Sequence, residues 1–281
     1  MSSCKIFTNS ISDMPVWLTQ KYNIGIIPDI VISQGKEYFC GIDLQPLQLY
    51  DMMRSSEMLP STSHPNEYIY ASYFREAEVY DEILCITVTS LMSGSYQTSS
   101  QTARSMEVEG FKTPIYIYDS QQVSYGLSLM VLEAAKMAEK GMTATQIITH
   151  LDSIRSKIGV YFCLQTLENA KKGGRVGEIK SLAAGLLKIL PILTFKNGTV
   201  KELRLVRNFQ KAILGFADYY KQLAKKDSMV FIFHANNEKD ALRVKQSILQ
   251  EEPDADVYTE WIGPAIGIYA GEGAVGIAFI E

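Results

Sequence analysis

The residues with the clearest chemical potential are Ser93, Gly94 and Ser95, in the stretch TSLMSGSYQTSSQTA (89–103). They follow ILCITV, an apolar β-branched run typical of a buried strand, at the point where a helical pattern begins. Hydroxyl groups and the free N–H groups of a first helical turn donate hydrogen bonds, and that turn carries partial positive charge. The stretch could therefore hold an anion, supply a nucleophilic serine, or simply cap a helix.

A nucleophilic serine needs a base, usually a histidine that a third group orients. The sequence has three histidines, His64, His150 and His234, and it contains no G-x-S-x-G motif. His150 lies within an amphipathic helical pattern, whereas His64 is in a predicted turn and His234 ends a predicted strand. The pattern therefore argues against a hydrolase without excluding a base at His64 or His234.

A second hydroxyl pair, Thr62-Ser63, precedes His64-Pro65 and another helical pattern. The simplest interpretation is again a helix cap. Two such pairs at two helix starts on one edge of a sheet could instead converge on a single anion, because ligands of doubly wound sheets bind where strands end and helices begin.

Glycines in KKGGRVG (Gly173, Gly174 and Gly177) suit a tight turn beside Arg175. This is not a Walker loop, because no G-K-[ST] ends it. No G-x-G-x-x-G follows the first strand, and GEGAVG near the C-terminus precedes a strand rather than a helix. The sequence therefore predicts neither an NTP-binding loop nor a dinucleotide cofactor.

The composition is that of an ordinary globular protein: 281 residues, 47% hydrophobic and 21% charged, with a formal net charge of −4. No basic run favours nucleic acid, no apolar run reaches the ~20 residues that span a bilayer, and the N-terminus lacks a secretion signal. The scattered Cys4, Cys40, Cys85 and Cys163 indicate free buried thiols rather than disulfides or zinc ligands. We expect a cytoplasmic protein without metal or cofactor.

Short apolar strands alternate with amphipathic helices along the first half of the chain, which predicts a parallel α/β sheet covered on both faces. The helix at 12–22 has Ser12 or Asp13 as its expected cap, with Pro15 in its first turn. The expected strands are 5–10, 24–33, 83–89 and 113–120, and the expected helices are 12–22, 45–57, 66–80, 131–141 and 143–158.

The second half differs, because Asn197-Gly198 between two strand-like runs predicts a hairpin and therefore a mixed sheet. The other expected strands there are 159–166, 228–235, 255–262 and 274–280, with helices at 209–226 and 238–250. We predict two α/β domains: residues 1–158 as a three-layer α/β/α domain with a mainly parallel sheet, and residues 159–281 with a mixed sheet. No linker separates them, so we expect a ligand site at their seam.

A helical pattern at 178–190, EIKSLAAGLLKIL, contains the small residues Ala183, Ala184 and Gly185. Small side chains permit close helix–sheet packing, or they leave a slot wide enough for an alkyl chain. A slot that ends at hydroxyl and N–H donors suits a fatty acid, whose tail gains ~0.8 kcal/mol per buried CH₂.

The chain resembles the DegV family of bacterial fatty-acid-binding proteins over essentially its whole length. Seven stretches carry the resemblance in order: TNSISDMP, TSHP, SLMSGSYQTS, YDSQQVSYG, LENAKKGGRVG, LLKILPIL and IGPAIGIYAGEGAVGIAF. The resemblance implies two α/β domains, a long-chain fatty acid in a buried pocket formed mostly by the C-terminal domain, and presentation of its carboxylate to a separate ATP-dependent fatty acid kinase. The acyl phosphate then enters phospholipid synthesis, so this chain would be a carrier subunit and not an enzyme.

By position, the resemblance implies that Thr62, Ser93 and the N–H of Gly94 bind the carboxylate, with Ser63 and Ser95 as neighbours. It also implies that Arg175 and Arg207 lie at the pocket mouth and serve the encounter with the kinase.

In the C-terminal glycine turn, this chain has Tyr269 and Glu272 where the family pattern has histidine and proline, and Asn9 replaces an aspartate. We expect the Tyr269 phenol to join the carboxylate ligands, although it cannot become cationic.

Two alternatives stay open at this point. The same crevice could hold a small carboxylated or phosphorylated substrate of an enzyme, which would need a short polar cleft and a base near Ser93. The protein could also be a lipid-sensing regulator that has no kinase partner.

Overall fold

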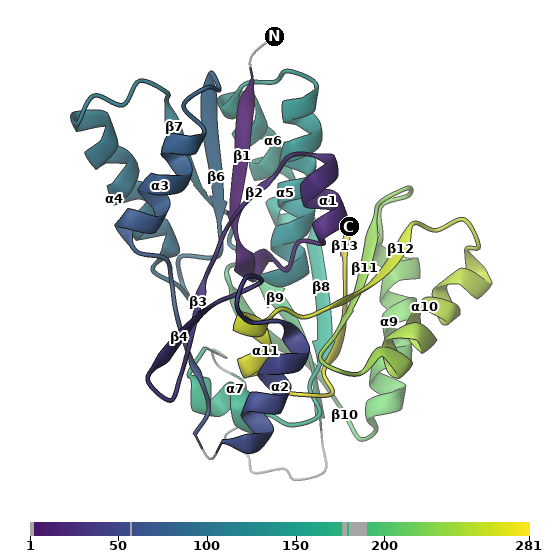
Figure 1. Ribbon diagram of the computed structural model, residues 1–281. Coiled ribbons are helices and arrows are strands. Elements are labelled where there is room, and N and C mark those ends of the chain that lie inside the picture. Colours follow the sequence, from purple (N-terminus) through teal and green to yellow (C-terminus); the bar gives the residue numbers. More distant parts are fainter. Residues whose placement is uncertain (1–2, 57, 176–178, 180–189) are drawn as a thin grey trace.

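The computed structural model describes residues 3–56, 58–175, 179 and 190–281. Its N-terminal half is built on a four-stranded, fully parallel sheet (Figure 1). The strand order is β2 (Gly25–Ile27), β1 (Cys4–Asn9), β6 (Glu82–Thr87) and β7 (Ile115–Asp119). The predicted parallel sheet is therefore confirmed, although the expected strand 24–33 breaks at Pro28-Asp29.

Helices cover both faces of this sheet, as the three-layer prediction requires. Buried side chains of α3 (Glu67–Glu76) and α4 (Ser95–Val108) pack on one face around Phe7, Phe74 and Met106. The other face carries α1 (Val16–Lys21), α5 (Ser124–Glu139) and α6 (Ala144–Ile154). The cap predicted at Ser12 or Asp13 was wrong, because Ser10–Ser12 form a 3₁₀ turn, η1, and α1 begins after Pro15.

A second sheet of six strands is mixed, as predicted. Its order is β10 (Thr199–Val206), β9 (Leu190–Lys196), β8 (Ile158–Cys163), β13 (Val275–Ile280), β11 (Val230–His234) and β12 (Val257–Trp261). The Asn197-Gly198 hairpin joins β9 to β10 with both residues at positive φ, which a tight hairpin turn demands. The helices α9 (Phe209–Leu223) and α10 (Glu238–Glu251) cover one face of this sheet.

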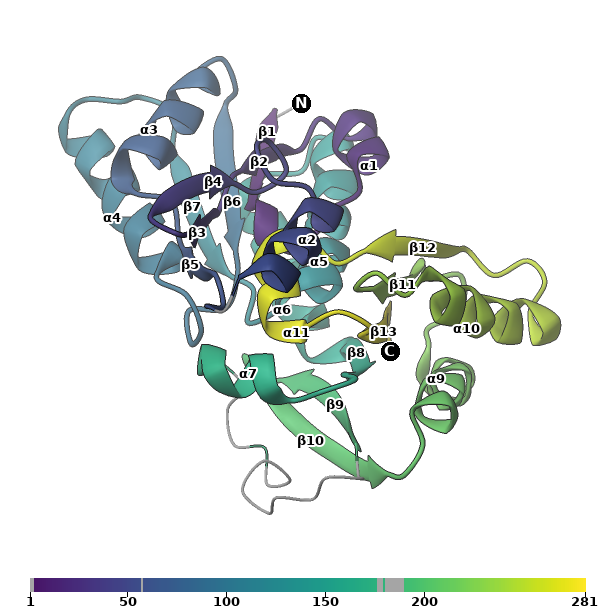
Figure 2. The same cartoon turned by 60° about the horizontal axis from the view of Figure 1, so that its bottom comes forward.

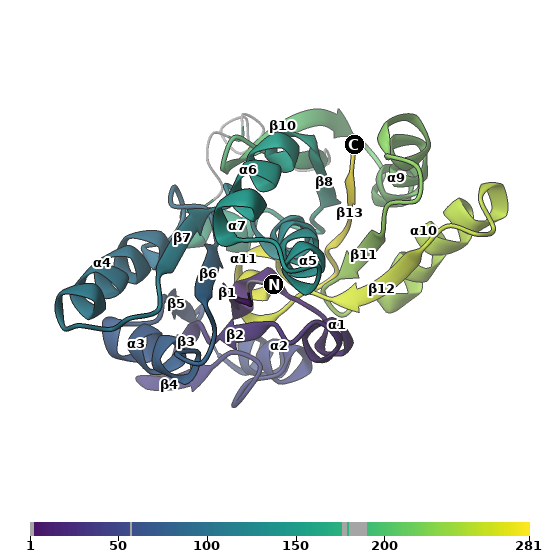
Figure 3. The ribbon, with the colours of Figure 1, turned by 90° about the horizontal axis from the view of Figure 1, so that it is seen from above.

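Helix α5 lies between the two sheets (Figure 3). It is buried over most of its circumference because it contacts β1 on one side and β8 and β13 on the other. Its Tyr125 hydroxyl donates to the Trp261 carbonyl at 2.6 Å, and its Ser128 hydroxyl donates to the Ser12 carbonyl at 2.7 Å. One helix thus ties both sheets into a continuous core. The division at residue 158 stays a prediction.

A small antiparallel sheet, absent from the sequence predictions, joins β4 (Lys36–Phe39), β3 (Ile30–Ser33) and β5 (Ser61–Ser63). Thr62 and Ser63 therefore lie on a strand, and the helix-cap interpretation of this pair was wrong. The cap of α3 is Asn66, whose side chain accepts from the Ile69 N–H at 3.0 Å. Because neither hydroxyl caps a helix, both are available to contact a ligand.

The remaining described helices are α2 (Pro46–Ser55), the 3₁₀ turn η2 (Arg155–Lys157), α7 (Glu168–Gly173) and α11 (Pro264–Ala270). Helix α11 comes from the C-terminal part of the chain but packs against α2 and α7 (Figure 2). The predicted small-residue helix, with Ala183, Ala184 and Gly185, and the turn residue Gly177 lie outside the described residues. No helix of the described chain is long and apolar enough to cross a membrane.

Candidate functional site

The carboxyl edge of the parallel sheet brings several loops together. Within the sheet, β2 lies on one side of β1. The next parallel strand along the chain, β6, lies on the other side, so the strand order reverses between β1 and β6. Ligands of open α/β sheets bind at such reversals. Here the edge gathers Ile11 after β1, Asp29 after β2, Ser93 after β6 and Val123 after β7.

These loops line one cavity, which we call the polar chamber, with about 860 Å³ of space including its opening to solvent. Besides the four residues just named, strand β5 and helix α11 contribute to its wall. The lining is Ile11, Asp29, Thr62, Ser63, His64, Val88, Met92, Ser93, Gly94, Val123, Arg175, Ala265, Ile266 and Tyr269. The structure thus brings six of the eight predicted site residues together.

Three hydroxyl groups of the polar chamber, those of Thr62, Ser93 and Tyr269, each contact another hydroxyl. The Thr62 Oγ1 and Tyr269 Oη atoms are 2.5 Å apart, and the Ser93 and Ser95 Oγ atoms are 2.9 Å apart. Ser93 Oγ also accepts from the Ser95 N–H at 3.2 Å, while Gly94, the N-cap residue of α4, provides no side chain. The Ser93 hydroxyl therefore supports the helix start and also lines the cavity.

Gly94 lies directly against the His64 ring. A Cβ atom at Gly94 would be only 2.7 Å from the nearest ring carbon, so any other residue would displace the imidazole. The His64 Nε2 atom is 3.0 Å from the Thr98 hydroxyl on α4. This contact holds the ring at the chamber wall and directs Nε2 to Thr98 rather than to Ser93.

Tyr269, on α11, is held by two glycine-turn residues. A Cβ atom at Gly173 would be 2.1 Å from the Tyr269 ring, so only glycine at position 173 leaves room for this ring. The Arg175 guanidinium lies 5.8 Å from the ring centroid and donates to the Gly173 carbonyl at 2.8 Å. These contacts place the phenol against Thr62 with a cation beside it.

Asp29 is a residue of the polar chamber that the sequence analysis missed. Its side chain is 3% exposed, and Oδ2 accepts from the Ile11 N–H at 2.8 Å and the Ser10 hydroxyl at 3.0 Å. Desolvation by burial raises the pKa of Asp29 to about 6, against the lowering effect of these donors. The only hint in the sequence is an aspartate interrupting an otherwise apolar run, IIPDIVI.

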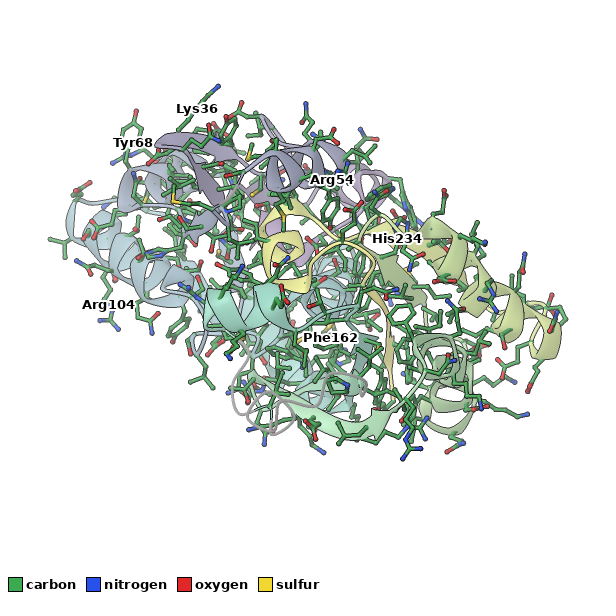
Figure 4. The ribbon with its side chains drawn as sticks, turned by 90° about the horizontal axis from the view of Figure 1, so that it is seen from below. Lys36, Arg54, Tyr68, Arg104, Phe162 and His234 are labelled. Atoms are coloured by element: carbon green, nitrogen blue, oxygen red, sulfur yellow. The ribbon has the colours of Figure 1, made fainter. Side chains whose placement is uncertain are left out.

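A second cavity, the apolar chamber, adjoins the polar one and holds about 730 Å³ including its opening. The two share Met92, Val123, Arg175, Ile266 and Tyr269. The rest of its lining is Ser124, Val160, Phe162, Leu164, Ala170, Phe195, Val200, Phe233, Ile262, Ala270, Ala274 and Val275. Figure 4 labels the half-buried Phe162 near the middle of its view, whereas the exposed Lys36, Tyr68 and Arg104 lie toward the outline.

Two predicted site residues lie apart from these cavities. The Ser95 side chain is fully buried beneath the chamber wall and reaches the cavity only through Ser93. Arg207 is exposed between β10 and α9 and lines neither chamber. That Arg207 lies at the pocket mouth therefore stays a prediction.

No histidine is hydrogen-bonded to Ser93 in the part of the chain that the structure describes. His150 lies 3.6 Å from Glu133 on a helix surface. His234 is buried against Trp261, and burial lowers its pKa to about 4. All four cysteines are buried and free, as predicted, and the described chain holds no group of three or more metal-ligating side chains. Ser93 thus has no hydrogen-bonded histidine of the kind that activates a serine nucleophile among the described residues.

A family model described as "Uncharacterised protein, DegV family" matches residues 3–281. The chain belongs to the DegV family. A DegV domain-containing protein of Clostridium perfringens is 32% identical, with 98% of each chain covered. One from Caldanaerobacter subterraneus subsp. tengcongensis is 29% identical, with all of both chains covered. The predicted family membership is therefore confirmed.

Solved DegV structures share the whole fold. A DegV family protein of Thermus thermophilus, described for its fatty acid binding, superposes with a TM-score of 0.90 at 25% identity, covering 99% of this chain and 100% of that one. DegV of Bacillus subtilis, described as a fatty acid binding protein, has a TM-score of 0.88 at 25% identity, with 99% of each chain covered. The predicted two-domain α/β architecture of the family is thereby confirmed.

Proposed function

We propose that this protein binds a long-chain fatty acid, with the tail in the apolar chamber and the carboxylate in the polar chamber. One observation carries the proposal: a cavity lined almost entirely by hydrocarbon lies beside a cavity that contains hydroxyl groups, and the two share five lining residues. Two DegV relatives are described as fatty-acid-binding proteins, and they support the same ligand class. A short polar cleft, which the alternative enzyme would need, fits this geometry less well.

The carboxylate ligands are the hydroxyls of Thr62, Ser93 and Tyr269 with the N–H of Gly94, and Ser63 stands beside them. All of these residues line the polar chamber. Such neutral donors hold a carboxylate without the bidentate clamp that arginine would form on both oxygens. One oxygen thus stays available for phosphorylation. Burial of the tail supplies most of the affinity, at ~0.8 kcal/mol per CH₂.

The protein acts as a carrier that presents this carboxylate to a separate ATP-dependent fatty acid kinase, and the acyl phosphate feeds phospholipid synthesis in the cytoplasm. Arg175, exposed at the polar chamber, and Arg207, exposed on the hairpin side, are available to a partner protein. The carrier needs no metal or cofactor of its own. A lipid-sensing regulator would use the same chambers without a kinase.

Mass spectrometry of an organic extract of the purified protein tests the ligand. We expect a long-chain acid in near-stoichiometric amount; an extract without one, together with failure of the stripped protein to bind added acids, would refute the proposal. The carrier role is tested separately with the host's kinase and ATP. Arg175→Ala and Arg207→Ala should slow acyl phosphate formation while the bound acid is retained, whereas a kinase that ignores the loaded protein favours the regulator.

A further inference from the structure

Asp29 adds a buried acid to the cavity proposed to hold another acid. Its position is fixed, because its own N–H donates to Ser10 Oγ at 2.8 Å while Oδ2 accepts from Ser10 and Ile11. Both of these hydrogen bonds to the carboxyl end at the same oxygen, Oδ2. A buried carboxyl that is hydrogen-bonded through Oδ2 therefore lines the polar chamber.

The groups packed around Asp29 do not offset the negative charge of its ionised carboxylate. Asp13, another buried acid, acts on the same region, and burial raises the pKa of its carboxyl to about 7. The nearby Cys40 thiol and Tyr70 phenol have raised pKa values, chiefly through burial, so both are neutral. Anionic Asp29 is thus surrounded by neutral or acidic groups on the protein side.

On the chamber side, Asp29 shares the cavity with His64, Tyr269 and Arg175. No ion pair joins His64 or Arg175 to Asp29 among the described residues, and Arg175 instead contacts the Tyr269 ring and the Gly173 carbonyl. His64 Nε2 is directed to Thr98. A ligand carboxylate that enters the chamber therefore meets a second carboxylate that lacks a cationic partner.

We propose that Asp29 and the carboxyl of the bound fatty acid share one proton, which is taken from solvent when the acid binds. This inference rests on the proposed function. Two carboxylates in one poorly solvated site cannot both ionise readily, so one of them retains a proton and donates to the other. The balance is Asp29–COO⁻ plus R–COO⁻ plus H⁺ from water, giving one O–H···O⁻ hydrogen bond between the two groups.

This arrangement makes loading depend on pH in a defined direction. Below about pH 6 Asp29 already carries its proton in the free protein, so binding of the fatty acid takes up few protons from solvent. Above that pH the proton must come from solvent, and linkage weakens the affinity by up to about tenfold per pH unit. Proton uptake therefore rises from near zero at about pH 5 toward one at about pH 8.

Calorimetric titration of oleate into the stripped protein, in phosphate and in Tris at pH 8, measures this uptake directly. The dependence of the observed heat on the ionisation heat of the buffer gives the number of protons bound. We expect close to one proton for the natural chain and close to none for Asp29→Asn. The asparagine variant should also bind oleate at least tenfold more tightly at pH 8, with an affinity that stays flat from pH 5 to pH 8.

The matched control is Asp254→Asn, which removes an exposed carboxyl far from both chambers in the segment before β12. It should take up protons as the natural chain does. Uptake near zero in the natural chain at pH 8, or full uptake in Asp29→Asn, would overturn the inference while oleate binding itself leaves the proposed function standing. Absence of oleate binding at every pH would instead reject the proposed function. The proton uptake of the natural chain at pH 8 tests the inference by itself, so poor folding of Asp29→Asn would not hide the result.

Discussion

The polar and apolar chambers adjoin, but they are built in different ways. The polar chamber draws its donors from loops after parallel strands, from β5 and from α11, so Thr62 meets Tyr269 across 207 positions. The apolar chamber is lined mostly by side chains that follow residue 158, largely on strands of the mixed sheet and the segments beside them. The polar groups come one or two from each segment, whereas six of the apolar lining residues stand on strands of a single sheet.

The two chambers also differ in how closely they specify their residues. A Cβ atom added at Gly94 would be 2.7 Å from the His64 ring, and one added at Gly173 would be 2.1 Å from the Tyr269 ring. Both positions therefore accept only glycine. Hydrocarbon walls tolerate exchange among apolar side chains of similar volume. We infer that head-group binding depends on single atoms, while tail binding depends on open volume.

The largest effect should come from filling the apolar chamber. Val200, on β10, is 7% exposed and faces the chamber; Leu205, on the same strand, is 43% exposed and faces solvent. Val200→Trp should occupy the space of the tail and reduce fatty acid content in the extract more than about 100-fold, since each excluded CH₂ loses ~0.8 kcal/mol. Leu205→Trp is the matched control and should retain the acid. Equal acid content in both variants would place the tail elsewhere.

Removal of one head-group donor should have a smaller effect. In Ser93→Ala the ligand carboxylate loses a hydrogen bond to a charged group, which corresponds to about 10- to 100-fold weaker binding. Ser105→Ala changes an exposed hydroxyl farther along α4 and should bind as the natural chain does. Competition with a fluorescent fatty acid measures both. Unchanged affinity in Ser93→Ala would remove this serine from the head-group site.

The smallest effect should follow loss of the Tyr269 hydroxyl. Tyr269→Phe keeps the ring that Gly173 accommodates but removes the 2.5 Å contact with Thr62, so we expect affinity to fall by roughly fivefold. Tyr219→Phe, on α9 and stacked on Tyr161 away from both chambers, is the control. A loss as large as that of Ser93→Ala would show that the two hydroxyl pairs contribute equally.

Much of the fold could be predicted because it depends on local patterns. The alternation of strands and helices, the Asn197-Gly198 turn and the helix after Asn66 all appear where the sequence indicates them. Helix α11 escaped notice because its seven residues include Gly267 and have little helical propensity. Its start is nevertheless marked by Pro264 in the first turn, a signal that could have revealed the helix that carries Tyr269.

The candidate site was predictable where hydroxyls stand at expected helix starts, as with Thr62 and Ser93, and where the family resemblance points to a residue, as with Tyr269. Asp29 and the position of His64 were not, because neither residue has a periodicity or a spacing that signals a site. Ser95 shows the converse: its motif is the same as that of Ser93, yet its side chain is fully buried. Adjacent residues of a helix start point in different directions, so a motif does not say which of them meets a ligand.

The sequence by itself determined the class of the fold, the positions of most elements and the presence of hydroxyl groups beside strand ends, because these depend on neighbours in the chain. The tertiary structure decided that the hydroxyls share one cavity, that a hydrocarbon-lined cavity lies beside it, and that Asp29 is buried there with its pKa raised to about 6. Cavities and desolvation are set by side chains distant in sequence, and no local pattern records them.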